Sequence, residues 1–239
     1  MIKVNLLENL KQDLESVVIR AGSAIMEVYE KDFEFNKKSD GSPVTEADKL
    51  SENIIIPALK DLCPDIPIIS EETSENKDIL NLKDFWLIDP IDGTYDYIND
   101  LEEFTINAGL IINNRPVAGL INAPAKKRMF YSYEKGNAFE FSNGKTINLS
   151  NIPVRKSENL KFISYSTKIK PEIQKIYDEL GVKENIRMKS SLKFCVVAAG
   201  EYDGYVAEPR AYEWDIAAGH AILEHSGGTV TDFQGNEIL

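Results

Sequence analysis

The sequence predicts an α/β protein, built as an α+β layered sandwich of helices and sheets. Three observations predict this class. Two amphipathic helical segments come first, a series of short strand segments follows, and β and α segments then alternate toward the end. With 239 residues, of which 43% are hydrophobic and 28% charged, the chain is long enough for a large core and has the composition of a globular enzyme.

The first helix is predicted from Leu6 to Val28, where apolar residues recur at spacings of three and four. A polar loop with a glycine follows at 37–43. The second helix is predicted to begin near Thr45, and its apolar residues are Leu50, Ile54, Ala58 and Leu62.

Strand patterns begin at Ile66 and are separated by turns that contain glycine or proline. The predicted strands are 66–70, 85–89, 104–112, 116–123, 129–136 and 137–144. After Pro153 the predicted order is strand 161–167, helix 171–180, helix 190–202, strand 203–208 and helix 213–227. This change predicts two halves, residues 1–151 and 152–239, of which the second has a sheet of its own.

The charge balance excludes several classes of partner. Against 27 basic residues there are 39 acidic ones, and the net charge of −12 disfavours binding to nucleic acid polymers and to anionic membranes. No secretory signal and no run long enough to span a membrane is expected, so Cys63 and Cys195 predict reduced thiols in a cytoplasmic protein. The two histidines, His220 and His225, offer little for a zinc site or a histidine-based triad.

An acidic segment carries the strongest chemical signal. Seven Asp or Glu residues and no Lys or Arg lie between Asp84 and Asn114, and Asp89 and Asp92 directly follow an apolar strand. Carboxylates gathered at the end of a buried strand repel one another and lose hydration, so a cation is expected among them. Hard oxygen ligands without His or Cys suit magnesium, calcium or manganese. The alternative is a solvated acidic turn in which Thr94 caps a helix over 95–99.

Other carboxylates have both a functional and a plain interpretation. Glu71 and Glu72 follow an apolar strand, where ligand sites collect, but a bare Glu-Glu pair is also typical of an exposed loop. Asp215 stands at the start of the last helix, as a ligand or as a helix cap. Asp48 would complete a capping-box-like start three residues after Thr45.

Taken together, these segments resemble a known family. The motifs that matter are ISEE, WLIDPIDGT, VTEAD and EWDIAAG. With them, and from its first helix to about Gly235, the chain resembles the inositol monophosphatase-like family of magnesium-dependent phosphatases. The resemblance implies an inositol monophosphatase-like αβαβα architecture. EFTINAGLI at 103–111 and SSLKFC at 190–195 resemble its CysQ branch, the 3′(2′),5′-bisphosphate nucleotidases. The chain departs from that branch at 95–97, where Tyr-Asp-Tyr replaces a Lys-Glu-Phe-like run, and at Glu102, which replaces a glycine.

The resemblance implies two or three Mg²⁺ ions. One would be held by Glu71, Asp89 and the main-chain carbonyl of Ile91. A second would share Asp89 and add Asp92 and Asp215. Paired ions would stabilise both the attacking and the leaving oxygens of an in-line displacement.

The resemblance also implies the remaining roles. Thr94 with Asp48 would activate the attacking water, and Glu72 would orient water or metal. Ser190, Ser191 and Lys193 would form a wall that contacts the nucleotide, although on their own they would be read as a helix cap and a solvated lysine. The full set expected to contact substrate is Glu71, Ile91, Asp92, Gly93, Thr94, Ser190, Ser191, Lys193 and Asp215, with Lys189 as a further cation. Cys195 and His220 are assigned to packing.

The predicted reaction is hydrolysis of adenosine 3′,5′-bisphosphate to AMP and phosphate, inhibited by lithium at millimolar levels or below. An inositol-1-monophosphatase or broad sugar phosphatase is the first alternative, and a non-catalytic role in binding a protein is the second. The expected partner is a small nucleotide bisphosphate. A homodimer is left open, and peripheral membrane association is not supported by the sequence.

Overall fold

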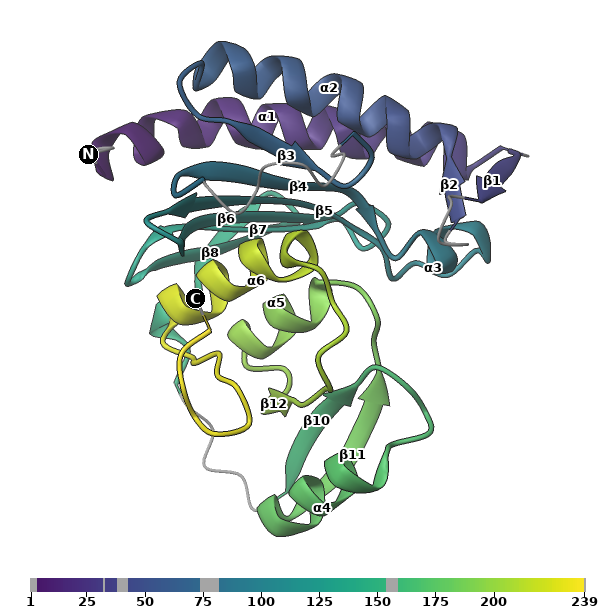
Figure 1. Cartoon of the computed structure of the whole chain (residues 1–239), viewed down its shortest axis with the longest axis vertical. Coiled ribbons are helices and arrows are strands. Elements are labelled where there is room, and N and C mark those ends of the chain that lie inside the picture. Colours follow the sequence, from purple (N-terminus) through teal and green to yellow (C-terminus); the bar gives the residue numbers. More distant parts are fainter. Residues whose placement is uncertain (1–3, 32, 38–42, 74–81, 154–158, 239) are drawn as a thin grey trace.

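The computed structural model describes residues 4–31, 33–37, 43–73, 82–153 and 159–238. Its elements stack in five layers (Figure 1), which confirms the predicted αβαβα architecture. The layers are helices α1 (Val4–Tyr29) and α2 (Glu46–Leu62), a seven-stranded sheet, helices α5 (Leu192–Ala198) and α6 (Glu213–Ser226), a three-stranded sheet, and helix α4 (Pro171–Leu180). None of the described helices has the length and apolar character needed to span a bilayer.

The seven-stranded sheet has the order β3-β4-β5-β6-β7-β8-β9. Only β3 and β4 run parallel, and every other neighbouring pair is antiparallel. The strands are β3 (Ile68–Ser70), β4 (Phe85–Asp92), β5 (Thr105–Ile112), β6 (Arg115–Ala123), β7 (Arg128–Glu134), β8 (Asn137–Ser142) and β9 (Lys145–Asn148). All but β9 were predicted, and β9 has only one apolar residue, Ile147, which is exposed.

The predicted loop at 37–43 is flanked by a short antiparallel pair, β1 (Phe35–Lys37) and β2 (Pro43–Thr45). Residues 38–42 of that prediction lie outside the described part of the chain.

The apolar stripe predicted for α2 is wrong in part. Leu50 is 41% exposed, whereas Ile55 and Leu59 are buried against the sheet. The same buried face carries the polar side chains of Asp48 and Ser51 near the start of the helix. These side chains face the carboxyl end of β4, where the Ser51 hydroxyl donates a hydrogen bond to the carbonyl of Pro90 at 3.0 Å.

The three-stranded sheet is entirely parallel, with β10 (Leu160–Ser164) between β11 (Val182–Arg187) and β12 (Gly204–Tyr205). Strand β11 escapes prediction because its central residues are charged or polar and exposed. Helix α5 and strand β12 are shorter than the predicted 190–202 and 203–208. The turn after α5 places Gly200 at φ +67°, a conformation that a helix does not continue through.

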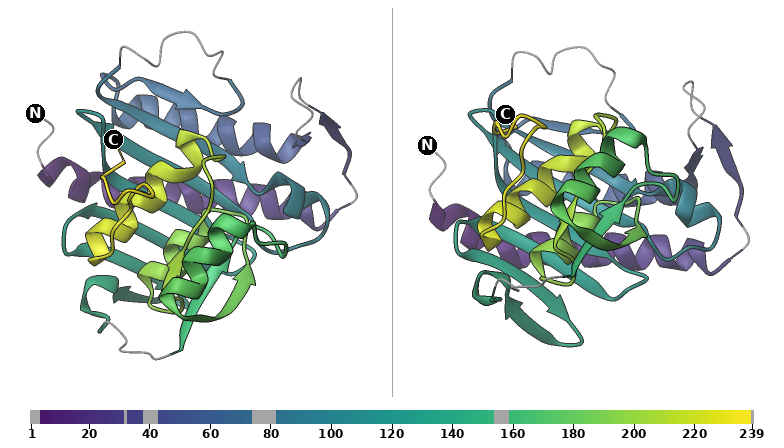
Figure 2. Two further views of the ribbon diagram at one scale, coloured as in Figure 1. Left: turned by 60° about the horizontal axis from the view of Figure 1, so that its bottom comes forward. Right: turned by 90° about the horizontal axis from the view of Figure 1, so that it is seen from below.

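Helix α6 belongs to the C-terminal half by sequence but packs on the first sheet. A Cβ atom at Gly109 of β5 would lie 2.8 Å from the Cβ of Ala217, and one at Gly119 of β6 would collide with the backbone of Ala218. The absence of these side chains lets α6 lie directly on the sheet, viewed from two further directions in Figure 2. The division into 1–151 and 152–239 separates the two sheets along the chain, and as a division into domains it stays a prediction.

Candidate active site

The carboxyl end of β4 turns two aspartates toward each other. In a regular strand, residues three apart point to opposite faces of the sheet. The pairing of β4 with β5 shifts between Asp89 and Asp92, since Asp89 pairs with Asn107 and Asp92 with Thr105. Pro90 has no N–H to give to a ladder, and the irregularity that results allows both carboxylates to face the same point.

Asp89 is buried and lies among other acids. Its Oδ1 atom accepts a hydrogen bond from the N–H of Ile91 at 3.0 Å, while its buried Oδ2 atom has no hydrogen-bond partner. Burial raises the pKa of Asp89 well above its ordinary value, and Glu71, Asp92 and Asp215 raise it further. Glu71 follows β3 and is held beside β4 by a hydrogen bond from its N–H to the carbonyl of Ile88 at 3.1 Å.

Asp215 comes from the first turn of α6. Its carboxylate accepts a hydrogen bond from the N–H of Tyr212 at 3.0 Å, so it caps the helix as one interpretation predicted. Burial and the neighbouring Asp92 raise its pKa to about 7, although Lys193 and the Tyr212 amide act in the opposite direction. Capping and metal binding are therefore compatible roles for this residue.

The three aspartates form one cluster that a divalent cation fits. One carboxylate oxygen from each of Asp89, Asp92 and Asp215 lies within 4.8 Å of the others. In the part of the chain that is described, no ion pair neutralises them. The raised pKa values, the unpartnered Oδ2 atom and the all-oxygen donor set fit a hard metal cation. The alternative of a wholly solvated turn fails for Asp89, which is buried.

Gly93 and Thr94 shape the next turn. Gly93 has φ +93° and precedes helix α3 (Thr94–Ile98), and a Cβ atom there would lie 2.9 Å from the carbonyl oxygen of Glu103. Thr94 is the first residue of α3, so the prediction that it caps a helix beginning at Tyr95 is wrong. Its hydroxyl instead donates a hydrogen bond to the carbonyl of Ile91 at 3.0 Å.

Asp48 forms the predicted capping box. Its Oδ2 atom accepts hydrogen bonds from the N–H of Thr45 at 2.7 Å and from the Thr45 hydroxyl at 2.8 Å. Asp48 is buried, and the face of α2 that carries it is joined to the carboxyl end of β4 through Ser51. Glu72 is half-buried in the turn after β3, next to Glu71.

Ser191 connects the cluster to the C-terminal half. Its N–H and its hydroxyl both lie within hydrogen-bond distance of Oδ2 of Asp92. The hydroxyl also lies 2.6 Å from the carbonyl oxygen of Asp215 and accepts a hydrogen bond from Asn107 at 2.9 Å. One side chain thus links β4, β5 and α6 around the acidic site.

The predicted nucleotide wall needs a correction. The exposed fractions of Ser190, Ser191 and Lys193 are 0%, 0% and 5%, so their side chains do not form an open surface. The Lys193 ammonium donates hydrogen bonds to the carbonyls of Lys189 and Ser190, at 3.1 and 3.0 Å. The plain alternative is wrong as well, because Lys193 is not solvated and the Ser191 side chain makes no capping bond. These residues therefore support the acidic site through buried contacts and do not line an open surface.

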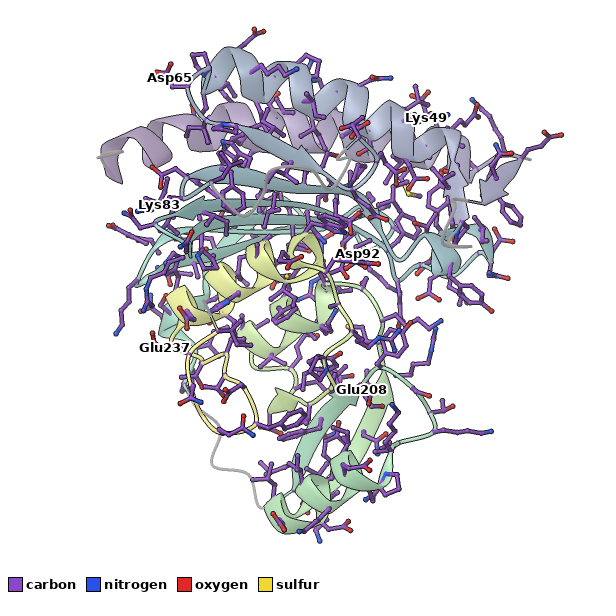
Figure 3. All side chains as sticks on the ribbon, viewed as in Figure 1. Lys49, Asp65, Lys83, Asp92, Glu208 and Glu237 are labelled. Atoms are coloured by element: carbon purple, nitrogen blue, oxygen red, sulfur yellow. The ribbon has the colours of Figure 1, made fainter. Side chains whose placement is uncertain are left out.

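Several residues near the site were missed by the sequence analysis. Asn107 is a lone amide in an apolar strand, and that contrast could have indicated its role. Arg187 ends β11 and donates a hydrogen bond to buried Asp96 of α3 at 3.0 Å, which ties α3 to the second sheet. No sequence pattern relates residues so far apart. Figure 3 labels Asp92, which lies where the end of β4 faces the start of α6.

The two residues assigned to packing are buried. Cys195 is a free, fully buried thiol whose pKa is raised by burial. The Nε2 atom of His220 lies 3.1 Å from Glu224, one turn later in α6.

Comparison with known proteins agrees with the fold. The sequence profile of the inositol monophosphatase family matches residues 6–239. The chain is 37% identical to the 3′(2′),5′-bisphosphate nucleotidase CysQ of Salmonella typhimurium, over 91% of this chain and 88% of that protein. It is 35% identical to the CysQ protein of Escherichia coli K12 over the same shares of the two chains.

Solved structures agree as well. The crystal structure of CysQ from Bacteroides thetaiotaomicron superposes with a TM-score of 0.75 at 29% identity, covering 90% of this chain and 85% of that one. The IMPase of Thermotoga maritima gives a TM-score of 0.77 at 27% identity, covering 97% and 88%. With a family profile that spans nearly its whole length and relatives of this similarity, the chain belongs to the inositol monophosphatase family of phosphatases.

Proposed function

We propose that this phosphatase is a 3′(2′),5′-bisphosphate nucleotidase that hydrolyses adenosine 3′,5′-bisphosphate to AMP and phosphate and depends on Mg²⁺. The observation that supports it best is the cluster of buried Asp89 with half-buried Asp92 and Asp215, in a chain whose curated relatives are named for this reaction. A cytoplasmic location is part of the proposal, and the two free cysteines support it.

In this proposal the metal ligands are Glu71, Asp89, the carbonyl of Ile91, Asp92 and Asp215. Two or three bound Mg²⁺ ions would supply charge stabilisation for the attacking and leaving oxygens of an in-line displacement. Ser191 keeps Asp92 aimed at the cluster, while the N-terminal turn of α6 fixes Asp215. Sensitivity to lithium stays a prediction of the same proposal.

The proposed water site lies between α2 and α3. The Thr94 hydroxyl donates a hydrogen bond to the carbonyl of Ile91, and its lone pairs remain able to accept a hydrogen bond from a water molecule. Asp48, fixed by Thr45, would complete the pair that orients this water, and Glu72 would orient water or metal from the turn after β3. Gly93 lets the backbone come close to the phosphate, with the N–H of Thr94 beside it.

An inositol or sugar phosphatase is the second candidate, supported by the likeness to the Thermotoga maritima IMPase. A role limited to binding another protein is disfavoured, because like charges gathered around buried Asp89 cost stability unless they bind a ligand.

Phosphate release from adenosine 3′,5′-bisphosphate and from inositol-1-phosphate, measured side by side, tests the substrate. We expect the nucleotide to have at least about tenfold the kcat/KM of the inositol phosphate, equivalent to ~1.4 kcal/mol in transition-state binding. A higher kcat/KM for inositol-1-phosphate would favour the second candidate and reject the nucleotidase assignment.

A further inference from the structure

Three residues follow the carboxyl ends of the three parallel strands. Tyr165 comes directly after β10, Lys189 follows β11, and Arg210 follows β12. In parallel sheets these ends lie at one edge, which is where ligands bind in open α/β sheets. The segment with Lys189 continues to Ser191, which contacts Asp92, and the segment with Arg210 continues to Asp215. These two segments therefore connect the edge to the acidic cluster.

Two cations share one aromatic ring at this edge. The guanidinium carbon of Arg210 lies 3.3 Å from the ring centroid of Tyr165. The Lys189 ammonium lies 5.7 Å from the same centroid and 4.1 Å from the ring centroid of Tyr95. Tyr95, in α3, is 54% exposed, so this group of side chains borders solvent. We call Lys189, Arg210, Tyr95 and Tyr165 the cationic edge.

The two cations of the edge have no acidic partner among the described residues. Neither forms an ion pair there, although neighbouring charges do: Arg187 pairs with Asp96, and Lys170 with Glu208. Figure 3 labels Glu208, which follows β12. The pKa of Lys189 is lowered, mainly by burial and also by Arg187 and Arg210, while Asp96, which is paired with Arg187, opposes this. In a chain of net charge −12, two cations that share one ring and form no ion pair of their own among the described residues offer charge to an anion.

A plain interpretation is that these are solvated cation–π pairs, which stabilise proteins modestly. It does not account for two cations on one ring at the edge that is connected to the acidic cluster. Nor does it account for the second ring, Tyr95, over which Lys189 also lies. Of the two cations predicted from sequence, Lys193 already donates hydrogen bonds to two carbonyls, which leaves Lys189.

We propose that Lys189 and Arg210, held over Tyr95 and Tyr165, bind the phosphate of the substrate that is not hydrolysed. The inference rests on the proposed function and adds the structural origin of a preference for substrates with two separated phosphates. Arg210 offers a planar fork of donors to the phosphate oxygens, and Lys189 offers a compact charge from the other side. Binding of this remote phosphate would assist both the binding of the substrate and its reaction at the acidic cluster.

The test compares two substrates that differ only in that phosphate, adenosine 3′,5′-bisphosphate and adenosine 3′-monophosphate. Arg210→Gln and Lys189→Gln should each lower kcat/KM for the bisphosphate by at least about tenfold, or ~1.4 kcal/mol. Hydrolysis of the monophosphate should stay within about twofold of wild type, because the contact does not exist for that substrate. Equal losses on both substrates, or no loss on either, would overturn the inference.

Lys145→Gln is the matched control. Lys145 is exposed on β9, the far edge strand of the seven-stranded sheet, so this variant changes the net charge equally without touching the cationic edge. It should affect neither substrate. Unchanged melting temperatures in all three variants would separate recognition from folding.

Calorimetric binding of 5′-AMP, which retains the proposed phosphate, tests the subsite independently of turnover. Arg210→Gln should weaken this binding about tenfold, or ~1.4 kcal/mol, and leave the weak binding of adenosine unchanged. If wild type released no phosphate from either nucleotide but this difference appeared, the proposed function would fail and the subsite would stand. Equal binding of 5′-AMP by wild type and Arg210→Gln would reject the subsite alone.

Discussion

The N–H and the hydroxyl of Ser191 both lie within hydrogen-bond distance of one carboxylate oxygen of Asp92. Asp92 ends a strand of the first sheet, and Ser191 is the residue before helix α5 of the C-terminal half. The two residues are 99 positions apart in sequence, so the acidic cluster is assembled only when both halves have folded together.

Ser191→Ala should weaken both stability and turnover. The variant leaves Asp92, the carbonyl of Asp215 and Asn107 without their shared hydroxyl partner, which typically costs about 1–3 kcal/mol. Urea unfolding and phosphate release measure the two effects. Ser190→Ala is the control, because the equally buried Ser190 hydroxyl accepts only a long bond from the N–H of Leu192, at 3.4 Å. Equal effects of the two substitutions would contradict the role given to Ser191.

Asp92→Asn should abolish turnover while leaving the fold intact. The amide keeps an oxygen that can accept from Ser191 but removes the negative charge expected to bind the metal, a loss of orders of magnitude in kcat, roughly a hundredfold or more. Circular dichroism and phosphate release at saturating Mg²⁺ measure fold and activity. Asp84→Asn is the control, an exposed carboxylate just before β4 that accepts from the N–H of Asn113. Near wild-type activity in Asp92→Asn would reject the metal-ligand role.

The stability of the metal-free protein should depend on the protonation of Asp215. Folding raises its pKa to about 7, so the folded state binds this proton more tightly than the unfolded chain does. The protonated carboxyl of Asp215 therefore contributes fully to stability when the pH is below the ordinary pKa of an aspartate, and this contribution is lost as the pH rises toward 7. In EDTA, Asp215→Asn should therefore gain stability relative to wild type between about pH 5 and about pH 8. Thermal unfolding of both proteins across that range measures it, and a constant or falling difference would contradict the raised pKa.

Lys193→Met should lower stability and should lower hydrolysis of every substrate by a similar factor. Its buried ammonium satisfies two carbonyls of the turn that positions Ser191, and methionine fills the space without donating to them. The melting temperature and kcat/KM for a nucleotide and a small phosphomonoester measure the effect. A loss confined to the nucleotide, with unchanged stability, would restore Lys193 as a recognition residue.

The elements with strong periodicity could be predicted from sequence. Helix α1 and strands β4, β5 and β6 carry continuous apolar patterns, and their order indicates the layered fold. Strands β9 and β11 could not be found, since edge strands with exposed side chains lack that pattern. Leu50 was placed on the wrong face of α2, because polar Asp48 and Ser51 are buried there toward the site.

The site residues likewise divide into those that could be predicted from sequence and those that could not. Asp89 and Asp92 could be found because they follow a buried strand, and Asp215 because its motif resembles a family pattern. The true setting of Ser191 and Lys193 depends on contacts with residues distant in sequence, and those contacts bury both side chains. Tyr165, Lys189 and Arg210 likewise come together because β11, β10 and β12 are parallel neighbours. No local sequence pattern indicates that strand order.

The dependence of adenosine 3′,5′-bisphosphate hydrolysis on Mg²⁺ tests the central claim most directly. Phosphate release should stop in EDTA, because the clustered carboxylates then have no cation and partly protonate. It should return in full when excess Mg²⁺ is added, and Asp92→Asn should show no such recovery. Phosphate release that continues unchanged in EDTA would contradict the claim that Asp89, Asp92 and Asp215 hold the ions required for the reaction.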